Sequence, residues 1–271
     1  MGVLVYVSYT CERYSSRSLQ RYSGKVHFCS VSFVVYVTAS RIIGGIIVQP
    51  YTCKYQGALL AIVPGLSEPK PYCGCTLIAQ QWAVSAAHCW RPAMMLVFGE
   101  HNLFIDEGYE QYFNVSGIYV HNFNYRTYNN DIMLIKLSKP ATINAYVEPA
   151  RLPGPTNPLE YMDTCTVSGW GVTSLYNPTP SDELRAVDVH LYTDCQYYYW
   201  GRVNSNMLCA GYRYGGKDAC KGDSGGPLMC NGYLEGIVSW GISCANPYFP
   251  GVYTKIRNYV NWIYWVMAND S

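Results

Sequence analysis

The chain has 271 residues, of which 49% are apolar and 14% are charged. This composition excludes an intrinsically disordered chain, and the length allows one all-β domain or two smaller units. Lys and Arg together number 19 and Asp and Glu together 18, so the formal charge is +1. A nucleic-acid-binding surface needs concentrated positive charge, so we expect no nucleic-acid partner.

Residues 1–41 are interpreted as a leader that contains a signal segment and a propeptide. The run 31–39 is apolar, follows the basic residues Arg17, Arg21 and Lys25, and ends on short side chains. This pattern is typical of a signal peptide core. Signals normally begin near the first residue, so this interpretation requires either that translation starts further along the chain or that the first twenty or so residues are an artefact of gene annotation. An ordinary β-strand is the alternative. The apolar run is too short for a membrane-spanning helix.

A cleavable joint follows the leader. Arg41 precedes the two β-branched residues Ile42 and Ile43, and two glycines come next. A cut after Arg41 would create a new amino group on Ile42. Such a group would need a buried carboxylate as its partner.

From Ile42 onward, short apolar or alternating runs are separated by Gly, Pro and Asn, which predicts an all-β chain. Alternation predicts a half-buried strand over 186–192, and apolar runs predict buried strands over 234–240 and 251–256. A helix is predicted over 257–267 because apolar residues recur there at helical spacing. These residues are Val260, Ile263, Tyr264 and Met267.

The segment G-D-S-G-G places Ser224 between glycines on a tight turn. Such a turn exposes the hydroxyl and aims backbone N–H groups at one point, as an oxyanion hole requires. The pattern also fits the nucleophile turn of α/β-hydrolases, in which the acid and the histidine follow the serine. No histidine follows Ser224, so the partner histidine must lie upstream.

Five histidines are present, and one of them, His88, has an unusual setting. His88 lies in V-S-A-A-H-C, where small neighbours let the imidazole reach past the backbone and the cysteine can clamp the turn. Asp131 lies just before an apolar run, where an acid is more often a turn residue or a cap. It nevertheless completes the order His88, Asp131, Ser224. A surface or core role is the better interpretation for the others: His27, His101, His121 and His190.

This order, in the motifs A-A-H-C, D-I-M-L and G-D-S-G-G-P, resembles the chymotrypsin-fold serine proteases, and specifically the trypsins. The resemblance runs from about Ile42 to Ala268. It also rests on N-M-L-C-A-G, G-K-D-A-C-K, G-I-V-S-W-G and P-G-V-Y-T-K-I. The segments C-Q-Y-Y-Y and G-I-S-C-A-N are most similar to the divergent third-group trypsins of fish.

The resemblance implies an all-β fold of two packed antiparallel six-stranded β-barrels with a C-terminal α-helix. The protease domain would span 42–271, with the boundary between its halves near 140–155. The chain would be a secreted digestive endopeptidase made as a zymogen. It would act as a monomer on protein and peptide substrates and meet protein protease inhibitors. No organic cofactor, nucleic acid or membrane is expected.

The resemblance also assigns catalytic roles. Ser224 would attack the scissile carbonyl, and His88 would carry the proton from the serine to the leaving amine. Asp131 would hold the imidazole in the required tautomer. The backbone N–H groups of Gly222 and Ser224 would form the oxyanion hole.

The activation joint receives a role from the same resemblance. Cleavage after Arg41 would free the amino group of Ile42, and Asp223 would pair with that group. Burial of this ion pair would lock the oxyanion loop only in the cleaved chain. The intact precursor is therefore expected to be nearly inactive.

Specificity follows from Asp218, which the resemblance places at the base of the pocket for the side chain before the scissile bond. A buried carboxylate there favours Arg or Lys, because an apolar guest leaves it unpaired. Gly241 and Gly251 match the open pocket walls. Ser239 and Trp240 match the strand that hydrogen-bonds the substrate backbone.

Two neighbours of the pocket depart from the common trypsin pattern. Ala219 stands where many trypsins carry a serine, so a Lys guest loses a hydrogen-bonding partner while Arg reaches the carboxylate directly. We therefore expect Arg to be preferred over Lys. Lys221 stands where Gln is usual at the pocket rim. It either favours acidic residues around the cut or is a solvated surface side chain.

A calcium site is a further implication of the resemblance. Several oxygen donors on one short loop suit a hard cation. The ligands would be the carboxylates of Glu100, Glu107 and Glu110 and the backbone oxygens of Asn102 and Ile105. The ion would stabilise the fold and take no part in catalysis. The alternative is a solvated acidic loop.

The 12 cysteines indicate an oxidising compartment. Cys11 and Cys29 lie in the leader, while Cys53 and Cys75 have no counterpart in trypsins, and whether they pair is left open. The stretch 61–70 is longer than the usual hairpin loop. The resemblance pairs the remaining eight as Cys73–Cys89, Cys165–Cys230, Cys195–Cys209 and Cys220–Cys244.

Two other classes of protein compete with an active secreted protease. A catalytically silent homologue could act as a binding module, although such proteins typically lose a triad residue or the activation joint, and this chain keeps both. That alternative stays open because the 61–70 stretch and Cys75 could disturb folding. A membrane-tethered protease would need a longer apolar anchor than 31–39.

Overall fold

The computed structural model divides the chain into two units, Met1–Ala39 and Ser40–Ser271. In the first unit, β1 (Leu4–Glu12) and β2 (Phe28–Tyr36) form an antiparallel pair. The residues described are 4–12 and 28–36, for the backbone alone, and 42–62, 65, 69–156, 158–174, 176, 178–192 and 194–270.

The run 31–39, predicted as a signal core, overlaps β2, so the alternative of a β-strand is what the structure shows up to Tyr36. Its role as a leader stays a prediction. The predicted cleavage residue Arg41 and the side chains of Cys11 and Cys29 lie outside the described residues.

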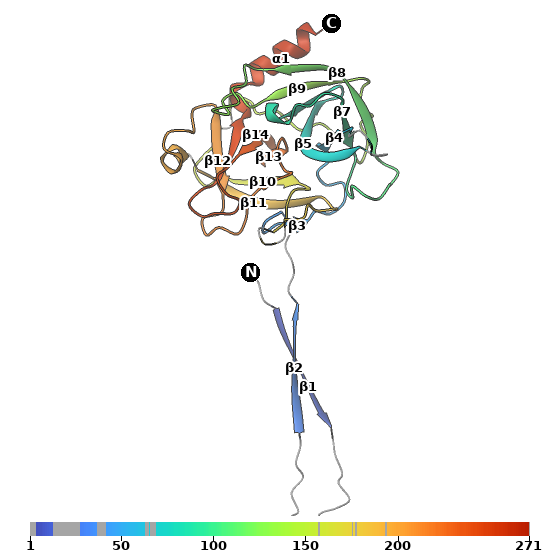
Figure 1. The fold of residues 1–271 in the computed structure, drawn as a ribbon, viewed down its shortest axis with the longest axis vertical. Coiled ribbons are helices and arrows are strands. Elements are labelled where there is room, and N and C mark those ends of the chain that lie inside the picture. The colour runs from blue at the N-terminus through green and yellow to red at the C-terminus, as the bar shows by residue number, and fades with distance from the viewer. Residues whose placement is uncertain are drawn as a thin grey trace, which may run out of the picture. The chain divides into compact units, whose positions relative to one another are not determined.

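Six strands of the second unit close into a first barrel in the order β4-β5-β6-β9-β8-β7 (Figure 1). Apolar side chains from these strands, among them Leu59, Leu77, Leu96 and Leu134, are fully buried in its interior. The strands are β4 (Gln56–Ala61), β5 (Lys70–Ala79), β6 (Trp82–Ser85), β7 (Met94–Phe98), β8 (Gln111–Val120) and β9 (Met133–Leu137).

A second barrel follows in the chain, with the order β10-β13-β14-β15-β12-β11. The pairing of β10 with β11 closes this ring, and the short strand β3 (Ile46–Ile47) adds to the outer edge of β11. The two six-stranded barrels predicted from the sequence are therefore confirmed. The strands are β10 (Thr164–Gly169), β11 (Arg185–Tyr192), β12 (Met207–Gly211), β13 (Pro227–Cys230), β14 (Tyr233–Trp240) and β15 (Gly251–Lys255).

The predicted alternation of buried and exposed side chains is confirmed in β11. Val187, Val189 and Leu191 are buried, and Asp188 between them is exposed. The first barrel ends at Leu137 and the next strand begins at Thr164. The boundary near 140–155 stays a prediction.

The C-terminal helix α1 (Val260–Asn269) begins three residues later than predicted, because a 3-10 helix, Ile256–Asn258, precedes it. Ile263 and Val266 are buried against the first barrel. Tyr264 was predicted to lie on the apolar face, and this was wrong, since it is 55% exposed. Asp270 accepts from Tyr119 and pairs with Lys136, so the helix ties the end of the chain to β8 and β9. Two further 3-10 helices are Ala87–Cys89 and Cys195–Tyr199.

Four disulfides join the pairs predicted from the resemblance. They are Cys73–Cys89, Cys165–Cys230, Cys195–Cys209 and Cys220–Cys244. Two of them, Cys73–Cys89 and Cys220–Cys244, lie beside the residues predicted to carry function.

Cys75 and the two ends of the 61–70 stretch, the features that raised doubt about folding, belong to the paired strands β4 and β5 of the first barrel. Cys75 is buried and unpaired, and it lies opposite Gly57 in the ladder, where an added Cβ would come 2.8 Å from the Cys75 sulfur. Cys53 is also unpaired. The ladder of β4 and β5 runs out to Ala61 and Lys70, and between these two residues only Ile62, Gly65 and Pro69 are described. The described part of the barrel keeps a closed ladder.

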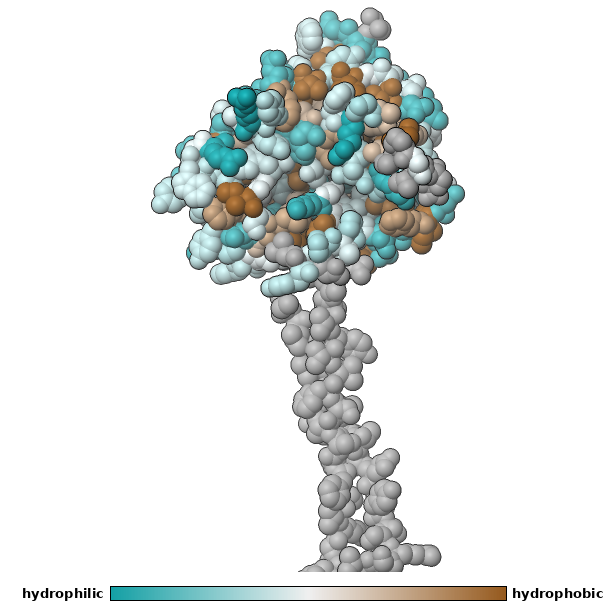
Figure 2. Space-filling model, in the orientation of Figure 1, coloured by the Kyte–Doolittle hydropathy of each residue, from teal (hydrophilic) through white to brown (hydrophobic). Residues whose placement is uncertain are grey.

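In the described part of the chain, no helix has the length and apolar character needed to cross a membrane. Figure 2 shows hydrophobic residues in separate groups among polar ones on the face in view.

Candidate active site

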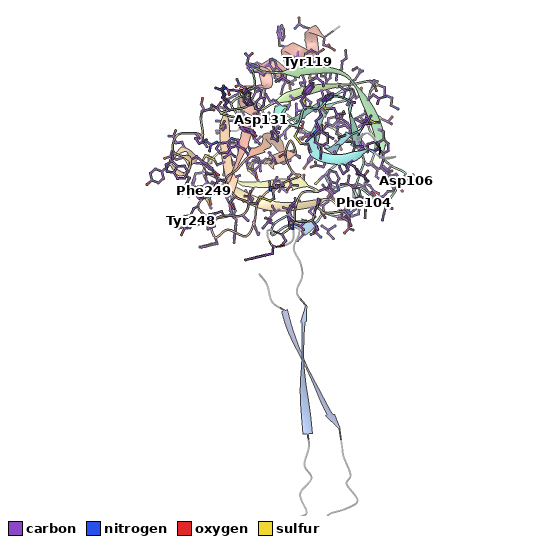
Figure 3. The ribbon with its side chains drawn as sticks, viewed as in Figure 1. Phe104, Asp106, Tyr119, Asp131, Tyr248 and Phe249 are labelled. Carbon is purple, nitrogen blue, oxygen red and sulfur yellow. A yellow bond between two sulfur atoms is a disulfide. The ribbon has the colours of Figure 1, made fainter. Side chains whose placement is uncertain are left out.

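Asp131 lies between the two barrels and is fully buried (Figure 3). Its Oδ1 accepts the backbone N–H of His88 at 2.9 Å, and its Oδ2 accepts the hydroxyl of Ser239 on β14 at 2.5 Å. Its carbonyl oxygen accepts the hydroxyl of Thr254 on β15 at 2.7 Å. Hydrogen bonds from both barrels therefore fix the carboxylate in place. A residue that only formed a turn would not need its carboxylate held in this way.

The imidazole of His88 faces this carboxylate. His88 Nδ1 is 2.7 Å from Asp131 Oδ2, and the His88 side chain is 21% exposed. A carboxylate accepts hydrogen bonds, so this contact places the imidazole proton on Nδ1 and leaves a lone pair on Nε2. The Cys73–Cys89 disulfide anchors the 3-10 helix that carries the ring. Because both sulfurs are bonded to each other, they supply no thiolate beside His88.

Ser224 lies in the turn before β13, close to the first barrel. Its carbonyl oxygen accepts the N–H of Gly74 on β5 at 2.7 Å and is 3.6 Å from the sulfur of Cys89, the residue after His88. The following residue, Gly225, has φ +80°, and an added Cβ would come 2.2 Å from the hydroxyl of Ser85. The turn thus needs glycine there. The fold brings all three predicted catalytic residues to the junction of the barrels.

The backbone around Ser224 leaves two N–H groups available. The Lys221 carbonyl accepts the N–H of Val172 at 2.7 Å. In a trans peptide the N–H points opposite to the C=O, so the N–H of Gly222 points away from Val172. Within the described residues, the N–H groups of Gly222 and Ser224 have no hydrogen-bond acceptor. They are free to bind an oxyanion.

A cavity of about 450 Å³ opens beside Ser224 and has Asp218 at its base. Asp218 is 2% exposed; its Oδ2 accepts the N–H of Ala245 at 2.9 Å, and its Oδ1 has no partner among the described residues. At Gly251 an added Cβ would come 2.9 Å from this free oxygen. At Gly241 it would meet only the Ser243 carbonyl, at 3.7 Å. Both glycines line the cavity, as do Ala219, Lys221, Ser239 and Trp240.

The base of the cavity holds two buried polar groups. Burial raises the pKa of Asp218 to about 7, against the opposing effects of the Ala245 and Ala219 N–H groups. The buried hydroxyl of Tyr253, also in the cavity wall, lacks a partner in the described structure. A buried carboxylate with a free lone pair costs free energy unless a donor reaches it.

Asp223 is a second buried carboxylate, behind the turn. Its Oδ1 accepts the N–H of Gly171 at 2.8 Å and its Oδ2 accepts the N–H of Cys220 at 2.9 Å. Burial raises its pKa to about 7, and no ion pair involves it among the described side chains. Ile42 is fully buried in the same barrel core as Ala219, and the carbonyl of Ile43 accepts the N–H of Asp218 at 3.1 Å.

The acidic loop after β7 brings three carboxylates together. Oxygen atoms of Glu100, Glu107 and Glu110 all lie within 4.8 Å of one another. Glu100 is 8% exposed, its Oε1 has no partner among the described residues, and burial followed by Glu110 and Glu107 raises its pKa to about 8. The carbonyl of Asn102 accepts the N–H of Ile105 at 3.0 Å. The nearby Phe104 and Asp106 mark this loop in Figure 3.

A network of amide side chains behind Asp131 was missed by the sequence analysis. Asn206 Nδ2 donates to Asn129 Oδ1 at 3.0 Å and to Asn130 Oδ1 at 3.1 Å, and the hydroxyl of Tyr259 donates to Asn130 Oδ1 at 2.8 Å. These bonds join the loop before Asp131 to the start of β12 and of α1. In the sequence, the two adjacent asparagines just before Asp131 are the pattern that could have indicated this network.

The trypsin family model matches residues 42–263, which is most of the second unit. The chain is also 44% identical over 233 residues to trypsin I-P1 of Gallus gallus, covering 85% of this chain and 90% of that protein. The chain belongs to the trypsin family of serine proteases. Trypsin-1 of Salmo salar is 43% identical over 250 residues, covering 89% of this chain and 99% of that trypsin. This trypsin-family chain is a serine endopeptidase, and its substrates are proteins.

Proposed function

We propose that this endopeptidase cleaves after Arg, and less efficiently after Lys. The observation that carries the proposal is the free Oδ1 of Asp218 at the base of the cavity beside Ser224. A guanidinium guest would supply the missing donor in a bidentate pair, whereas an apolar guest would leave the carboxylate buried and unpaired.

The reaction proposed is acyl transfer through Ser224. The Ser224 hydroxyl attacks the carbonyl carbon of the substrate, and its proton passes to His88 Nε2. Asp131 stabilises the imidazolium that forms, because it accepts from Nδ1 at 2.7 Å. The imidazolium then gives the proton to the leaving amine, and water repeats the sequence on the acyl-enzyme.

Backbone donors complete the proposed mechanism. The free N–H groups of Gly222 and Ser224 would stabilise the negative oxygen of the tetrahedral intermediate, by about 3 kcal/mol for each donor. The substrate backbone would pair with the end of β14 at Ser239 and Trp240. The last backbone hydrogen bonds on this edge are those of Val238 with Gly225 and Gly226, just before β13 begins.

The preference for Arg over Lys rests on Ala219, which lines the cavity beside Asp218. A lysine side chain is shorter than an arginine side chain. Its ammonium group would need a hydroxyl at position 219 to bridge the remaining distance to the Asp218 carboxylate. The test is kcat/KM for three peptides that differ only before the scissile bond, with Arg, Lys or Phe. The order Arg, Lys, Phe is expected. The highest kcat/KM on the Phe peptide would refute the pocket assignment. In Ala219→Ser, the ratio of kcat/KM for the Lys peptide to that for the Arg peptide should rise.

We also propose that the protease is a zymogen activated by cleavage between Arg41 and Ile42. The Asp223 carboxylate is buried without an ion-pair partner in the described structure, and the new amino group of Ile42 would supply one. Removing a partner from a buried ion pair costs about 3–5 kcal/mol. An Arg41→Gln chain, which cannot be cut there, should therefore have about 10²–10³-fold lower kcat/KM than the cleaved protein.

The matched control for activation is Asp223→Asn in a chain that has been cut after Arg41. It should show a loss of similar size, because the ammonium then lacks its carboxylate. N-terminal sequencing verifies the cut, and kcat/KM on the Arg peptide gives the result. Full activity of the uncut chain would contradict the proposal.

A calcium ion is proposed at Glu100, Glu107 and Glu110. Their clustered oxygens and the free, buried Oε1 of Glu100 fit the donor set that this hard cation prefers. At calcium about 100-fold above Kd, we expect Tm to rise by about 5–10 °C relative to EDTA. Glu100→Gln should abolish the shift, whereas Glu160→Gln, an exposed acid elsewhere, should retain it. A wild-type Tm that is the same in calcium and in EDTA would refute the site.

The proposed setting is extracellular digestion. Four disulfides support export, because such bonds persist in oxidising compartments. The leader, the monomeric state and binding of protein protease inhibitors belong to the same proposal. Secretion of the full chain from cultured cells, followed by mass measurement of the product, tests the leader directly.

A further inference from the structure

Arg202 is an exposed cation held beside the entrance of the specificity cavity. Its guanidinium carbon lies 5.0 Å from the centre of the Trp240 ring, and Trp240 lines the cavity at the end of β14. In the described structure, Arg202 has no ion pair and no side-chain hydrogen bond. The one acid of its loop, Asp194, instead accepts from Gln196.

The loop that carries Arg202 is anchored at both sides. Tyr199 is fully buried, donates to the carbonyl of Pro250, and meets the Trp240 ring edge-on at 5.0 Å between centres. The Cys195–Cys209 disulfide closes the loop. Arg202 is thus presented by a fixed backbone and is stacked on an aromatic ring, so less side-chain freedom is lost when it binds an anion.

A substrate strand that pairs with the end of β14 would lie close to this cation. On this edge of β14, Val238 still exchanges backbone hydrogen bonds with Gly225 and Gly226. Beyond Val238 the edge has no hydrogen-bonded partner from β13 among the described residues, so an extended peptide can add to it there as a strand. The residues before the scissile bond would then run past Trp240 and reach Arg202. The charged residues that line the cavity are Asp218, which is buried, and Lys221, which is exposed and forms no ion pair within the described residues. The cavity therefore has a negative base and a positive rim.

We propose that Arg202, stacked on Trp240, forms a subsite for an acidic side chain two to four residues before the scissile bond. The inference rests on the proposed cleavage after Arg and names the substrate class more closely: peptides in which Asp or Glu precedes the cleaved Arg. The carboxylate of the substrate would accept from the guanidinium without displacing it from the indole ring.

The test uses matched fluorogenic peptides that end in Arg before the reporter and carry either Asp or its neutral isostere Asn at one of the three preceding positions. The quantity measured is the ratio of kcat/KM for the Asp and Asn peptides of each variant, so that a general change of activity cancels. For the wild-type protein at low salt we expect a ratio of about two to five at one or more positions. The ratio should approach one at about 0.5 M salt.

Arg202→Met keeps an unbranched chain against the indole and should bring the ratio to one, while Arg202→Glu should bring it below one. Lys221→Met is the matched control, since it removes the same charge from the Ser224 side of the cavity and should retain the preference. A wild-type ratio of one at all three positions, or an equal loss in Lys221→Met, would overturn the subsite. If the wild-type protein cleaves neither the Asp nor the Asn peptides, cleavage after Arg is itself refuted, and the subsite is refuted with it.

Discussion

Replacing His88 by Ala is expected to lower kcat by a factor of about 10⁴–10⁶ while the protein stays folded. Ser224 then has no base to accept its proton, and only the backbone donors and the binding of the substrate remain to accelerate the reaction. The His88 side chain is 21% exposed and belongs to a helix already held by the Cys73–Cys89 disulfide, so its removal leaves the fold supported. Single-turnover kinetics on an Arg ester measure the acylation step directly.

The control for this prediction is His190→Ala. His190 lies on β11 in the second barrel, and its ring is 3.4 Å from the hydroxyl of Thr164. That change should leave kcat within about twofold of the wild-type value. An Asp131→Asn variant should lose about 10⁴-fold, because the amide can hold His88 in the wrong tautomer. Retained activity in His88→Ala with an intact circular dichroism spectrum would exclude His88 as the base.

Replacing Asp218 by Asn should lower kcat/KM for Arg peptides by at least about 10³-fold and raise the stability of the free protein at pH 8. The activity falls because the guanidinium loses its charged partner in a buried site. Activity on a Phe peptide should change much less, so the ratio of Arg to Phe cleavage is the decisive quantity.

Asp218→Asn lowers activity but is expected to raise stability, and the gain in stability depends on pH. Burial raises the pKa of Asp218 to about 7, above its value in the unfolded chain. The contribution of this group to stability is complete below the unfolded pKa and is lost as the pH rises toward 7. A neutral amide at this position carries no such penalty, so the Tm advantage of Asp218→Asn should grow between pH 4 and pH 8. Asp188→Asn, an exposed acid on β11, serves as control, and an equal Tm change in both variants would contradict the argument.

Much of the candidate site could be predicted from local sequence. The glycines around Ser224 follow from the tight turn, and an added side chain at Gly225 would strike Ser85. The alternation in β11 follows from the two faces of a strand, which depend on period alone. The paired cysteines and the order His88, Asp131, Ser224 were accessible only because their spacing matches a family, since no local property of the chain brings them together.

The sequence by itself determined which residues are able to do chemistry and which segments form strands, because composition, period and turn residues act locally. Only the tertiary structure decided which side chains meet. Closure of the two barrels buries Asp131 under Ser239 and Thr254 and leaves Asp218 with a free oxygen. It also stacks Arg202 on Trp240, which lies on a different segment of the second barrel. These contacts join residues far apart in the chain, and their geometry exists only once the ladders have closed and excluded water.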